Sequence, residues 1–374
     1  MIDIIEVTTD KHRKMFAKLP FDIYKGNKYW LPPIIKSEIA NITPELNPFF
    51  NKCEAKFWIA VDEKNNVLGR IGAIVPHEYI KKTGEKIGRI TRPEFFDNAE
   101  AVNKLFFTAE QWLKSKSMIG VSGPLGFSNI DTQALLVEGF DQLPSVASVY
   151  HLPYYQEHFN RLGYKKLEDW VEFNLFLDED MPEKIYRVSD IVRQRYKLKI
   201  LQMKNSEMMW KYGHEIFHLL NEAFKDLFSF IPFDDAEIDY ILKSYIPLIN
   251  PEFVHLVFKE DGKLIGFIIP VPSLSKTMQI ANGKIGLRAL ISLIRSRKHN
   301  DIIDLFLTGV DPEYQSKGVT GFLMTEAFKV MRQYNIKIAD TTGMLEDNQK
   351  ALQNWKNFKH VMNKRKRCYI KYFD

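Results

Sequence analysis

One pattern of strands and turns occurs twice in this chain at a distance of 197 residues, and such a repeat restricts the possible folds strongly. Residues 57–76 predict a strand, a polar turn and a second strand that contains Gly69. Residues 254–272 predict the same order, with Gly266 in the equivalent place. Near the end of each copy, apolar residues alternate with polar ones in the same phase and at the same spacing: Val171, Phe173 and Leu175, then Cys368, Ile370 and Tyr372. The pattern indicates an internal duplication.

Each copy also contains a predicted helix that is followed by a further strand. In the first copy, residues 99–116 carry apolar side chains at the helical period and precede a strand at 119–121. In the second copy, residues 319–334 have the same character and precede a strand at 337–341. A chain of 374 residues exceeds what one hydrophobic core usually supports. We therefore predict two domains, residues 1–178 and 179–374, each an α/β fold in which helices flank a mixed, mostly antiparallel sheet.

Composition narrows the settings in which such a chain works. Two cysteines, Cys53 and Cys368, are too few for a disulfide framework, and the longest apolar stretch is far shorter than a bilayer requires. Residues 1–14 mix acids and bases, unlike a secretory signal. We therefore expect a cytoplasmic protein with no membrane partner. The net charge of +5 and the basic run 364–367 come without a nucleic-acid-binding motif, so we do not expect a nucleic-acid partner.

A short loop containing glycine lies between the predicted strand 303–310 and the helix that begins near Val319. Backbone N–H groups in the first turn of a helix lack partners within the helix, and the peptide dipoles place partial positive charge there. Gly318 lets the backbone approach a ligand closely, so the loop predicts a binding place for a pyrophosphate. The loop matches neither a Walker loop nor a dinucleotide fingerprint. The simpler interpretation is an ordinary turn from a strand to a helix.

This loop resembles the acyl-coenzyme A loop of the GNAT acyltransferases, which is written Q/R-x-x-G-x-G/A. Gln315 and Gly318 fit that pattern, whereas Thr320 takes its last position and Gly321 follows one residue late. Further segments make nearly the whole chain similar to a bacterial family of tandem GNAT proteins: residues 47–50, 68–71, 123–127, 138–141, 153–164, 344–348 and 367–371. The resemblance implies two GNAT-like folds in one chain.

From this resemblance we expect acetyl-coenzyme A or another acyl-coenzyme A to bind the second domain only. The first copy reads T-R-P-E-F-F-D-N at residues 91–98, so Phe95 and Phe96 occupy the place that a pyrophosphate needs. In the second copy, the resemblance implies these cofactor-binding residues: Val310, Gln315, Ser316, Lys317, Gly318, Val319, Thr320, Gly321 and Asn348. Asn348 is explained equally well as the cap of a helix at 349–358.

The resemblance also implies an N-acyltransferase that acts on a small amine or an amino acid derivative. Acyl transfer from a thioester needs a base for the amine and an acid for the leaving thiolate. Candidate bases are Asp304, Glu346 and Asp347, and candidate acids are Tyr314, Tyr334, Tyr369 or water, of which Asp304, Glu346 and Tyr369 are our choice. Trp355 stands where many GNAT enzymes carry an acidic Tyr, so a non-catalytic acyl-coenzyme A sensor is one alternative. A transferase that uses aminoacyl-tRNA as donor is another, because the chain has a net positive charge.

The first domain is then a scaffold or a wall of the acceptor pocket. Residues 123–127 form a rigid, glycine-rich turn. Asn129, Asp131 and Gln133 follow it and offer polar groups suited to orienting a ligand. A long surface loop is the alternative interpretation.

The motif H-E-x-x-H at residues 214–218 is the pattern of a helical zinc site, in which two imidazoles lie one turn apart. Glu237 is the one distant candidate for a third ligand. An apolar stripe that includes Trp210 and Phe217 places His214 against the core. We therefore assign no metal ligands, and a zinc hydrolase is kept as an alternative function.

The segment 287–298 is amphipathic, with Arg288 and Arg295 beside Leu290 and Ile294. Such a segment can lie on a membrane or against a lipid-like acyl chain. We expect instead a helix, inserted between two strands of the second domain, that packs on the sheet.

Overall fold

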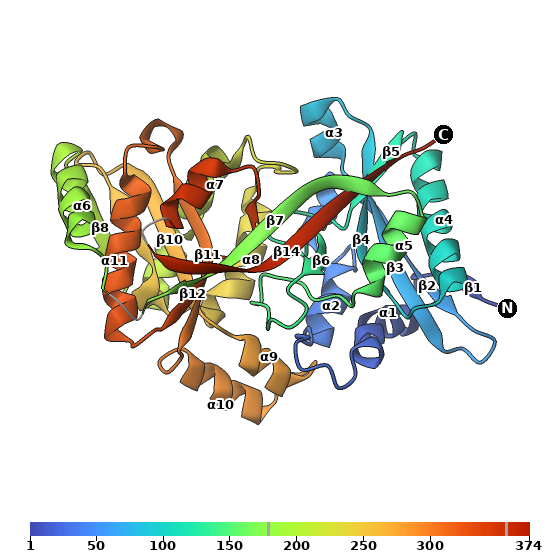
Figure 1. The fold of residues 1–374 in the computed structure, drawn as a ribbon. Helices are drawn as coiled ribbons and strands as arrows, with labels where there is room; N and C mark the ends of the chain where they lie inside the picture. Colours follow the sequence, from blue (N-terminus) through green and yellow to red (C-terminus); the bar gives the residue numbers. More distant parts are fainter. Residues whose placement is uncertain (178–179, 356–357) are drawn as a thin grey trace. The chain divides into compact units, whose positions relative to one another are not determined.

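The computed structural model describes residues 1–177, 180–355 and 358–374, which form two compact units. Unit 1 comprises Met1–Trp170, Met278–Ala289 and Lys364–Asp374. Unit 2 comprises Val171–Thr277 and Leu290–Asn363. Each unit is a sheet with helices on its faces (Figure 1). Among the helices of the described ranges, none is both long and apolar enough to cross a membrane.

Unit 1 is built on a mixed sheet with the strand order β1-β2-β3-β4-β5-β14. Neighbouring strands are antiparallel except β4 and β5, which are parallel. Its elements are β1 (Asp3–Glu6), α1 (Asp10–Ile23), α2 (Ile35–Asn41), η1 (Pro48–Lys52), β2 (Glu54–Val61), β3 (Val67–Val75), α3 (His77–Thr83), β4 (Ile87–Phe95), α4 (Ala99–Ser115), β5 (Gly120–Gly123), β6 (Leu135–Glu138), α5 (Tyr154–Arg161), the start of β7 (Lys165–Phe176) and the end of β14 (Lys359–Tyr372).

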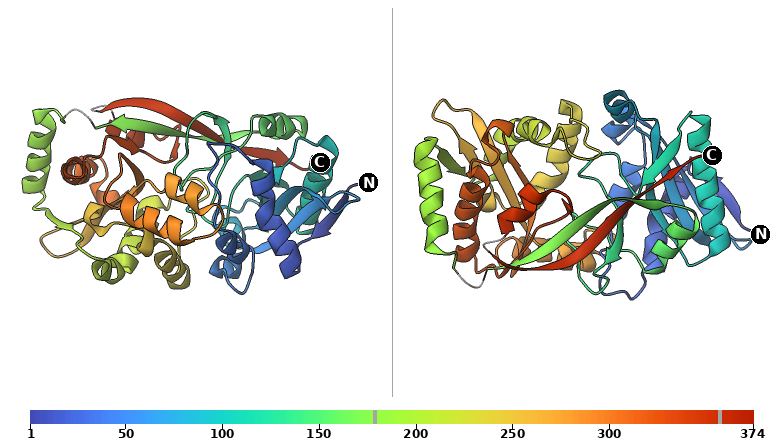
Figure 2. Two further views of the ribbon diagram at one scale, coloured as in Figure 1. Left: turned by 90° about the horizontal axis from the view of Figure 1, so that it is seen from below. Right: turned by 45° about the horizontal axis from the view of Figure 1, so that its top comes forward.

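The two faces of this sheet bury two separate apolar cores because side chains alternate along each strand. From β2, Trp58 and Ala60 join the core that contains Leu105 of α4. Phe57 and Ile59, which alternate with them, join the core that contains Phe16 of α1. Helices α1 and α4 therefore cover opposite faces, and Figure 2 gives two further views of these layers.

Unit 2 has the strand order β8-β9-β10-β11-β12-β7, and β11 and β12 are its parallel pair. Its elements, besides the end of β7 and the start of β14, are α6 (Glu183–Arg195), β8 (Lys199–Gln202), α7 (Ser206–Phe224), α8 (Asp235–Tyr245), η2 (Ile246–Leu248), η3 (Pro251–Phe253), β9 (His255–Phe258), β10 (Leu264–Pro272), β11 (Ile302–Val310), η4 (Pro312–Tyr314), α11 (Val319–Gln333), β12 (Ile338–Asp340), β13 (Met344–Leu345), α12 (Gln349–Leu352) and η5 (Gln353–Trp355). Helices α9 (Ser275–Ala281) and α10 (Leu287–Ser296) are divided between the units, because Met278–Ala289 belongs to unit 1. Unit 2 thus repeats the element order of unit 1, from an edge strand to a helix that follows the fourth strand.

The two glycines that mark the repeat have the same structural reason. A Cβ at Gly69 would lie 2.6 Å from Cδ1 of Leu105, and a Cβ at Gly266 would lie 3.0 Å from Cδ1 of Leu323. Leu105 lies on α4 and Leu323 on α11, which are equivalent helices in the two units. In both units, the glycine in the third strand lets the helix after the fourth strand pack closely against the sheet. This shared feature supports the duplication.

The strands that end the two copies are long, and each belongs partly to one unit and partly to the other. Residues Val171–Phe176 of β7 belong to unit 2, where Ile338 of β12 pairs with Phe176. The end of β14 belongs to unit 1, where Tyr369 pairs with Gly123 of β5. The compact units therefore group residues differently from the predicted domains 1–178 and 179–374, because each copy's last strand contributes to the other unit.

Helices α9 and α10 lie in an insertion between β10 and β11, the third and fourth strands of unit 2, whereas unit 1 has the short helix α3 in the equivalent place. The expectation that this segment packs its apolar stripe on the sheet is wrong. Ala289 is the buried residue of α10. Leu287, Leu290, Ile291 and Ile294 are 45% to 75% exposed. The helix turns its small and polar side chains inward and its large apolar side chains outward.

Candidate functional site

The predicted phosphate-binding loop joins β11 to α11 in unit 2. Asp311 follows β11 and caps the short turn of η4, where its side chain accepts a hydrogen bond from the Glu313 amide at 2.9 Å. Lys263 forms a 2.8 Å ion pair with the same carboxylate. Gln315 donates a side-chain hydrogen bond to the carbonyl of Val310 at 3.2 Å. These contacts fix the start of the loop against the end of the strand.

The start of α11 is open. Gly318 occupies the N-cap position with φ of 85°, and within the described chain no side-chain hydrogen bond caps this helix. The first helical hydrogen bond runs from the Phe322 amide to the Gly318 carbonyl at 3.0 Å. The amides of residues 319–321 therefore precede the first helical bond and point out of the helix end. The peptide dipoles of α11 place partial positive charge at the same point.

Glycine is required at position 318 for two reasons. Its φ lies in the left-handed region, which disfavours residues with a Cβ. A Cβ there would also lie 2.8 Å from Cγ2 of Val192 on α6. The structure thus brings most of the predicted cofactor-binding residues into one surface loop: Gln315, Ser316, Lys317, Gly318 and Gly321 are exposed, Thr320 is half-buried, and Val310 and Val319 have buried side chains.

Strand β11 extends beyond its parallel neighbour β12. Their parallel pairing runs from Ile302 to Asp304, whereas β11 continues to Val310. The pairing ends where β12 itself ends at Asp340, and the Thr342 hydroxyl just beyond it donates to the carbonyl of Leu305 at 3.0 Å. Asp304 lies at the far end of β11, so it is separated from Val310 by about 20 Å along the strand. Asp304 is buried and does not share the loop with the other predicted residues.

Glu346 and Asn348 lie in the turn between β13 and α12, and both are half-buried. The Leu352 amide donates to the Asn348 carbonyl at 3.1 Å, so Asn348 occupies the start of α12 as the helix-cap interpretation expects. The helix predicted at 349–358 is α12 followed by η5, and residues 356 and 357 lie outside the described ranges. Trp355 is buried in the unit 2 core, and its indole lies 3.1 Å from the sulfur of Met344. The position that carries a Tyr in many GNAT enzymes is here part of the core.

Tyr369 is in unit 1, not in unit 2 with the loop. Its ring lies 4.9 Å from that of Phe159 and is almost fully buried in the core of unit 1. Burial raises the pKa of the Tyr369 hydroxyl. The prediction that Tyr369 joins the site followed from its place in the second copy. It did not foresee that the end of β14 completes the first unit.

The equivalent junction in unit 1, between β4 and α4, is filled by side chains of the same unit. Phe95 is fully buried and stacks on Tyr155 at 4.3 Å between ring centroids. Asn98 caps α4 by accepting a hydrogen bond from the Ala101 amide at 3.0 Å. Asp97 contacts His158 at 2.8 Å. Neighbouring side chains of unit 1 therefore occupy the groups that a phosphate would use.

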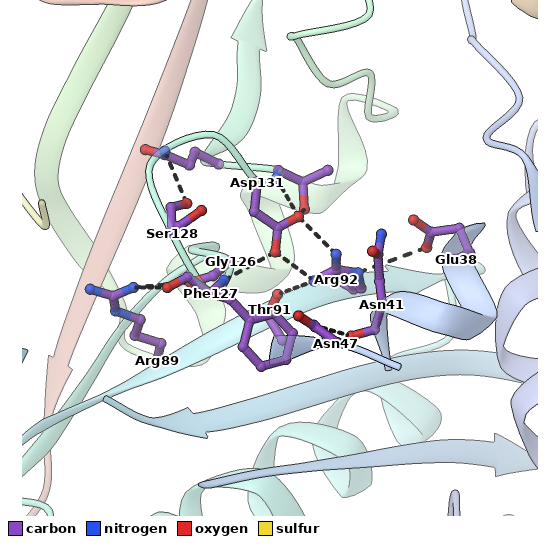
Figure 3. A network of polar contacts seen from close by, with 12 residues as sticks. Glu38, Asn41, Asn47, Arg89, Thr91, Arg92, Gly126, Phe127, Ser128 and Asp131 are labelled. Atoms are coloured by element: carbon purple, nitrogen blue, oxygen red, sulfur yellow. Dashed lines mark hydrogen bonds and ion pairs between the residues drawn. The ribbon is translucent and has the colours of Figure 1, made fainter. Parts of the chain in front are cut away.

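A network of buried charges, which sequence reasoning missed, lies on the α1 side of unit 1 (Figure 3). Arg92 of β4 has φ of 49° and forms a 2.7 Å ion pair with Asp131. Glu38 lies 3.8 Å from Arg92 and 3.5 Å from Arg70. Arg89 donates to the carbonyl of Gly126 at 3.0 Å. The signal was present in the sequence, because β4 carries several charged residues within a strand that is otherwise apolar.

This network also explains the polar residues after the glycine-rich turn. Asp131 accepts a hydrogen bond from the Phe127 amide at 3.0 Å, so it holds its own loop as well as Arg92. Gln133 forms an isolated bridge with Leu125 across the same loop. Asp131, predicted to orient a ligand, thus has internal partners in this structure.

The H-E-x-x-H motif lies on α7, and two expectations about it are wrong. The His214 side chain is 41% exposed and lies 2.9 Å from Asp239 of α8, so it is not packed against the core. Trp210, assigned to the apolar stripe, is also exposed. Glu237 is buried and forms the capping box of α8 with Asp234, which leaves it unsuited as a metal ligand. Asp235, rather than Glu237, is the carboxylate near both histidines.

Residues 213–358 match the family model described as the acetyltransferase (GNAT) family. This match shows a GNAT domain in residues 213–358, in agreement with the family of N-acyltransferases that the sequence resembles. A tandem GNAT protein from the clavulanic acid biosynthesis pathway has the same fold, with a TM-score of 0.57 and 11% identity over 100% of this chain and 98% of that chain. The predicted family and fold class are confirmed.

Two bacterial proteins are more similar in sequence to this chain. The bacterial ceramide synthase of Caulobacter vibrioides is 27% identical over 292 residues, which cover 76% of this chain and 73% of that protein. Protein YghO of Escherichia coli is 24% identical over 331 residues, which cover 84% of this chain and 81% of that protein. Both similarities extend over most of the two-unit chain.

Proposed function

We propose that this chain is an acyl-coenzyme A-dependent N-acyltransferase whose unit 2 binds the thioester at the start of α11. The observation that carries the proposal is the open helix end at Gly318, where a Cβ would collide with Val192. Three successive amides and the positive end of the helix dipole suit the pyrophosphate of coenzyme A. Exposed Lys317 adds a positive charge beside them.

The edge of β11 beyond Asp304 supports a place for the rest of the donor. Since β12 pairs with β11 only as far as Asp304, backbone groups near Val310 lie beyond that pairing. Val310 is then positioned to hold the thioester carbonyl through its amide. When bound, the thioester supplies an acyl carbon that is activated toward amines. Glu346 is the proposed base, because Asp304 lies at the other end of β11 from Val310.

The acceptor in this proposal is an amine. Its class follows from the GNAT family and from the named relative in Caulobacter, a ceramide synthase. Ceramide is the amide of a long-chain amino alcohol, so two acceptor types are worth separating: a small amine or amino acid derivative, and a long-chain amino alcohol.

The test is thiol release by the purified full chain. Acyl-coenzyme A donors from acetyl to palmitoyl are combined with each of the two acceptor types, and the amide product is identified by mass spectrometry. Amine-dependent thiol release with stoichiometric amide supports the proposal. Tight binding of the thioester without release under any combination identifies a sensor instead.

A donor exchange completes the test. Aminoacyl-tRNA replaces the thioester in a parallel reaction with the same amines. Transfer from aminoacyl-tRNA but not from any acyl-coenzyme A overturns the proposed donor. The loop at Gly318 would then have no role in binding coenzyme A.

A further inference from the structure

Two pairs of side chains face each other across helices α7 and α8, and none of them takes part in the proposed transfer reaction. His214 and His218 are four residues apart on α7, and Asp235 and Asp239 are four residues apart on α8. Residues at that spacing share one face of a helix. Gly213 lets the helices approach, because a Cβ there would lie 2.6 Å from Cδ1 of Leu242 on α8.

Three side chains that can bind a metal ion lie close together. One ligand atom each from His214, His218 and Asp235 lies within 4.8 Å of the other two. Nδ1 of His214 is 3.4 Å from Asp235, and Nε2 of His218 is 3.9 Å from the same oxygen. Ligands at about 2.1 Å from a tetrahedral zinc ion are about 3.4 Å apart, so small rotations of exposed side chains are enough.

The fourth residue orients the first. Nε2 of His214 lies 2.9 Å from Asp239, the distance of a hydrogen bond in which the imidazole N–H donates. Metal-ligating histidines commonly donate their other N–H to a carboxylate in this way. With Nε2 as the donor, the lone pair of Nδ1 faces the Asp235 carboxylate, and a cation between the two removes that repulsion.

We propose that His214, His218 and Asp235 bind one divalent transition-metal ion, with Asp239 as the positioning residue for His214. Imidazole nitrogens favour zinc, nickel, cobalt and copper over magnesium and calcium. The ion joins α7 to α8, and it is a binding site in addition to the donor loop. The expectation that the chain has no metal ligands is replaced by this proposal.

The test is equilibrium dialysis of the metal-free, untagged full chain against zinc chloride. We expect one zinc ion per chain with micromolar affinity and no displacement by magnesium. His218→Gln and Asp235→Asn should each weaken binding at least about tenfold. His299→Gln is the matched control, since His299 is exposed outside this cluster, and it should leave binding unchanged.

Two outcomes overturn the proposal. One is zinc stoichiometry that is the same in the wild type, His218→Gln and Asp235→Asn. The other is less than one bound zinc at micromolar concentrations. Hydrogen exchange provides a second measurement, because zinc should slow exchange of amides in α8 in the wild type and not in Asp235→Asn. Circular dichroism spectra establish that the variants are folded.

The exposed face of α10 carries a second, independent inference. In unit 2, Leu290, Ile291 and Ile294 are 45%, 58% and 61% exposed, although apolar residues at this spacing normally face a core. Arg295 and Lys298 are exposed beside them. A helix with apolar residues on one face and cations at its flanks has the character of a segment that lies on an anionic membrane.

We infer that α10 docks on the surface of an anionic lipid bilayer, in contrast to the expectation of no membrane partner. The occupant follows from charge complementarity, because the arginine and lysine match phosphate headgroups while the aliphatic side chains enter the acyl boundary. Since none of the described helices is long and apolar enough to cross a membrane, such binding is confined to the surface.

The test is co-sedimentation of the full chain with phosphatidylcholine vesicles that do or do not contain phosphatidylglycerol. We expect binding to the anionic vesicles only, weakened by salt. The triple variant Leu290→Ser, Ile291→Ser, Ile294→Ser should lose it. The matched control Val188→Ser, Ile191→Ser changes exposed apolar residues on α6 and should retain it.

Equal sedimentation of the triple variant and the wild type overturns this inference, as does the absence of binding to either vesicle. A change from dimer to monomer in the triple variant without any vesicle binding assigns the face to a second copy of the chain. Vesicle binding and oligomeric state are measured without thiol release. A failure of the membrane inference is therefore distinguishable from a failure of the proposed transferase activity.

Discussion

The junctions β4–α4 and β11–α11 occupy the same place in two copies of one fold, yet one is closed and the other is open. Asn98 caps α4 with its side chain, whereas Gly318 starts α11 without a side-chain cap. Phe95 fills the space beside the first junction, and the second is exposed. A duplicated fold can therefore keep its strands and helices while one copy caps its own helix end with a side chain and the other leaves that end uncapped by side chains.

The fourth strands of the two units, β4 and β11, also differ in the side chains that they carry. Glu94 pairs with Arg70 in unit 1, and Gly309 pairs with Phe267 in unit 2, each one residue beyond the shared glycine. Glu94 accepts hydrogen bonds from Tyr24 and Tyr155 at 2.6 and 2.7 Å. Unit 1 thus has a charged pair of positions with internal partners where unit 2 has the buried Phe267 opposite a glycine.

The largest effect should come from breaking the charge network of unit 1 with Asp131→Ala. Arg92 has a buried side chain and would lose its 2.7 Å partner. Removing one member of a buried ion pair costs about 3 to 5 kcal/mol, because an uncompensated charge stays in the interior. Urea unfolding followed by circular dichroism measures this loss. Thioester binding by the folded variant should be unchanged if unit 1 serves structure alone.

Asp141→Ala is the control for that change, because Asp141 is an exposed carboxylate in the same unit. It should shift the unfolding free energy by less than about 0.5 kcal/mol. A loss of less than about 1 kcal/mol in Asp131→Ala would mean that Glu38 alone compensates Arg92. The network would then be weaker than its geometry indicates.

The second prediction concerns the β11–α11 junction of unit 2, which a substitution at Gly318 should close. Gly318→Asp places a carboxylate where it caps the amides of α11 and repels a phosphate. We expect the affinity for acyl-coenzyme A to fall about a hundredfold, equivalent to about 2.8 kcal/mol. Calorimetric titration measures this loss. A companion variant that adds Val192→Ala removes the 2.8 Å contact, so that a packing defect does not account for the result.

Gly84→Asp provides a matched control, because Gly84 also has a positive φ, of 76°, but ends α3 in open space. It reproduces the backbone strain without touching the loop, and its thioester affinity should equal that of the wild type. Wild-type affinity in Gly318→Asp would contradict the proposal that α11 holds the phosphates.

The two junctions also show which parts of such a structure can be read from a sequence. The strand predicted at 303–310 and the helix at 319–334 correspond closely to β11 and α11, because periodicity and a glycine are local signals. The aromatic residues at the first junction, which include Phe95, were an equally local signal. Both parts of the comparison were therefore visible before the structure.

Features that depend on pairing between distant segments were not visible. Tyr369 belongs to unit 1 because the end of β14 pairs with β5, more than 240 residues earlier in the chain. Arg92, Asp131 and Glu38 meet only after β4, the loop behind β5 and α2 have packed together. Such contacts depend on tertiary packing and on the division of β7 and β14 between the units. The spacing of residues in the sequence carries no information about either.

A smaller effect concerns the proton on Glu94. Burial raises the pKa of this carboxyl from 4.5 to about 7, against the opposing charge of Arg70. Between these values the folded state binds more protons than the unfolded state, so the contribution of Glu94 to stability is complete below pH 4.5 and is lost as the pH rises through 7. Glu94→Gln should therefore gain about 2 kcal/mol relative to the wild type between pH 5 and pH 8.

Denaturation curves at a series of pH values measure that difference. Glu85→Gln, an exposed carboxylate of the same unit, should show no such trend. A constant difference between Glu94→Gln and the wild type across this range would indicate that Glu94 is ionised throughout. It would then interact with Arg70 as a permanent ion pair.

The smallest effect is expected from changing Asn98. This change tests whether the helix cap or the packed core closes the β4–α4 junction. Asn98→Ala removes the 3.0 Å cap on the Ala101 amide and should lower the unfolding free energy by about 1 kcal/mol, and Asn98→Gly by a few tenths. Neither variant should bind acyl-coenzyme A in calorimetric titration when Gly318→Asp has disabled unit 2. Phe95 still fills the space, so freed amides alone do not make a phosphate site. Binding regained in Asn98→Gly would instead show that the cap is what separates the two copies.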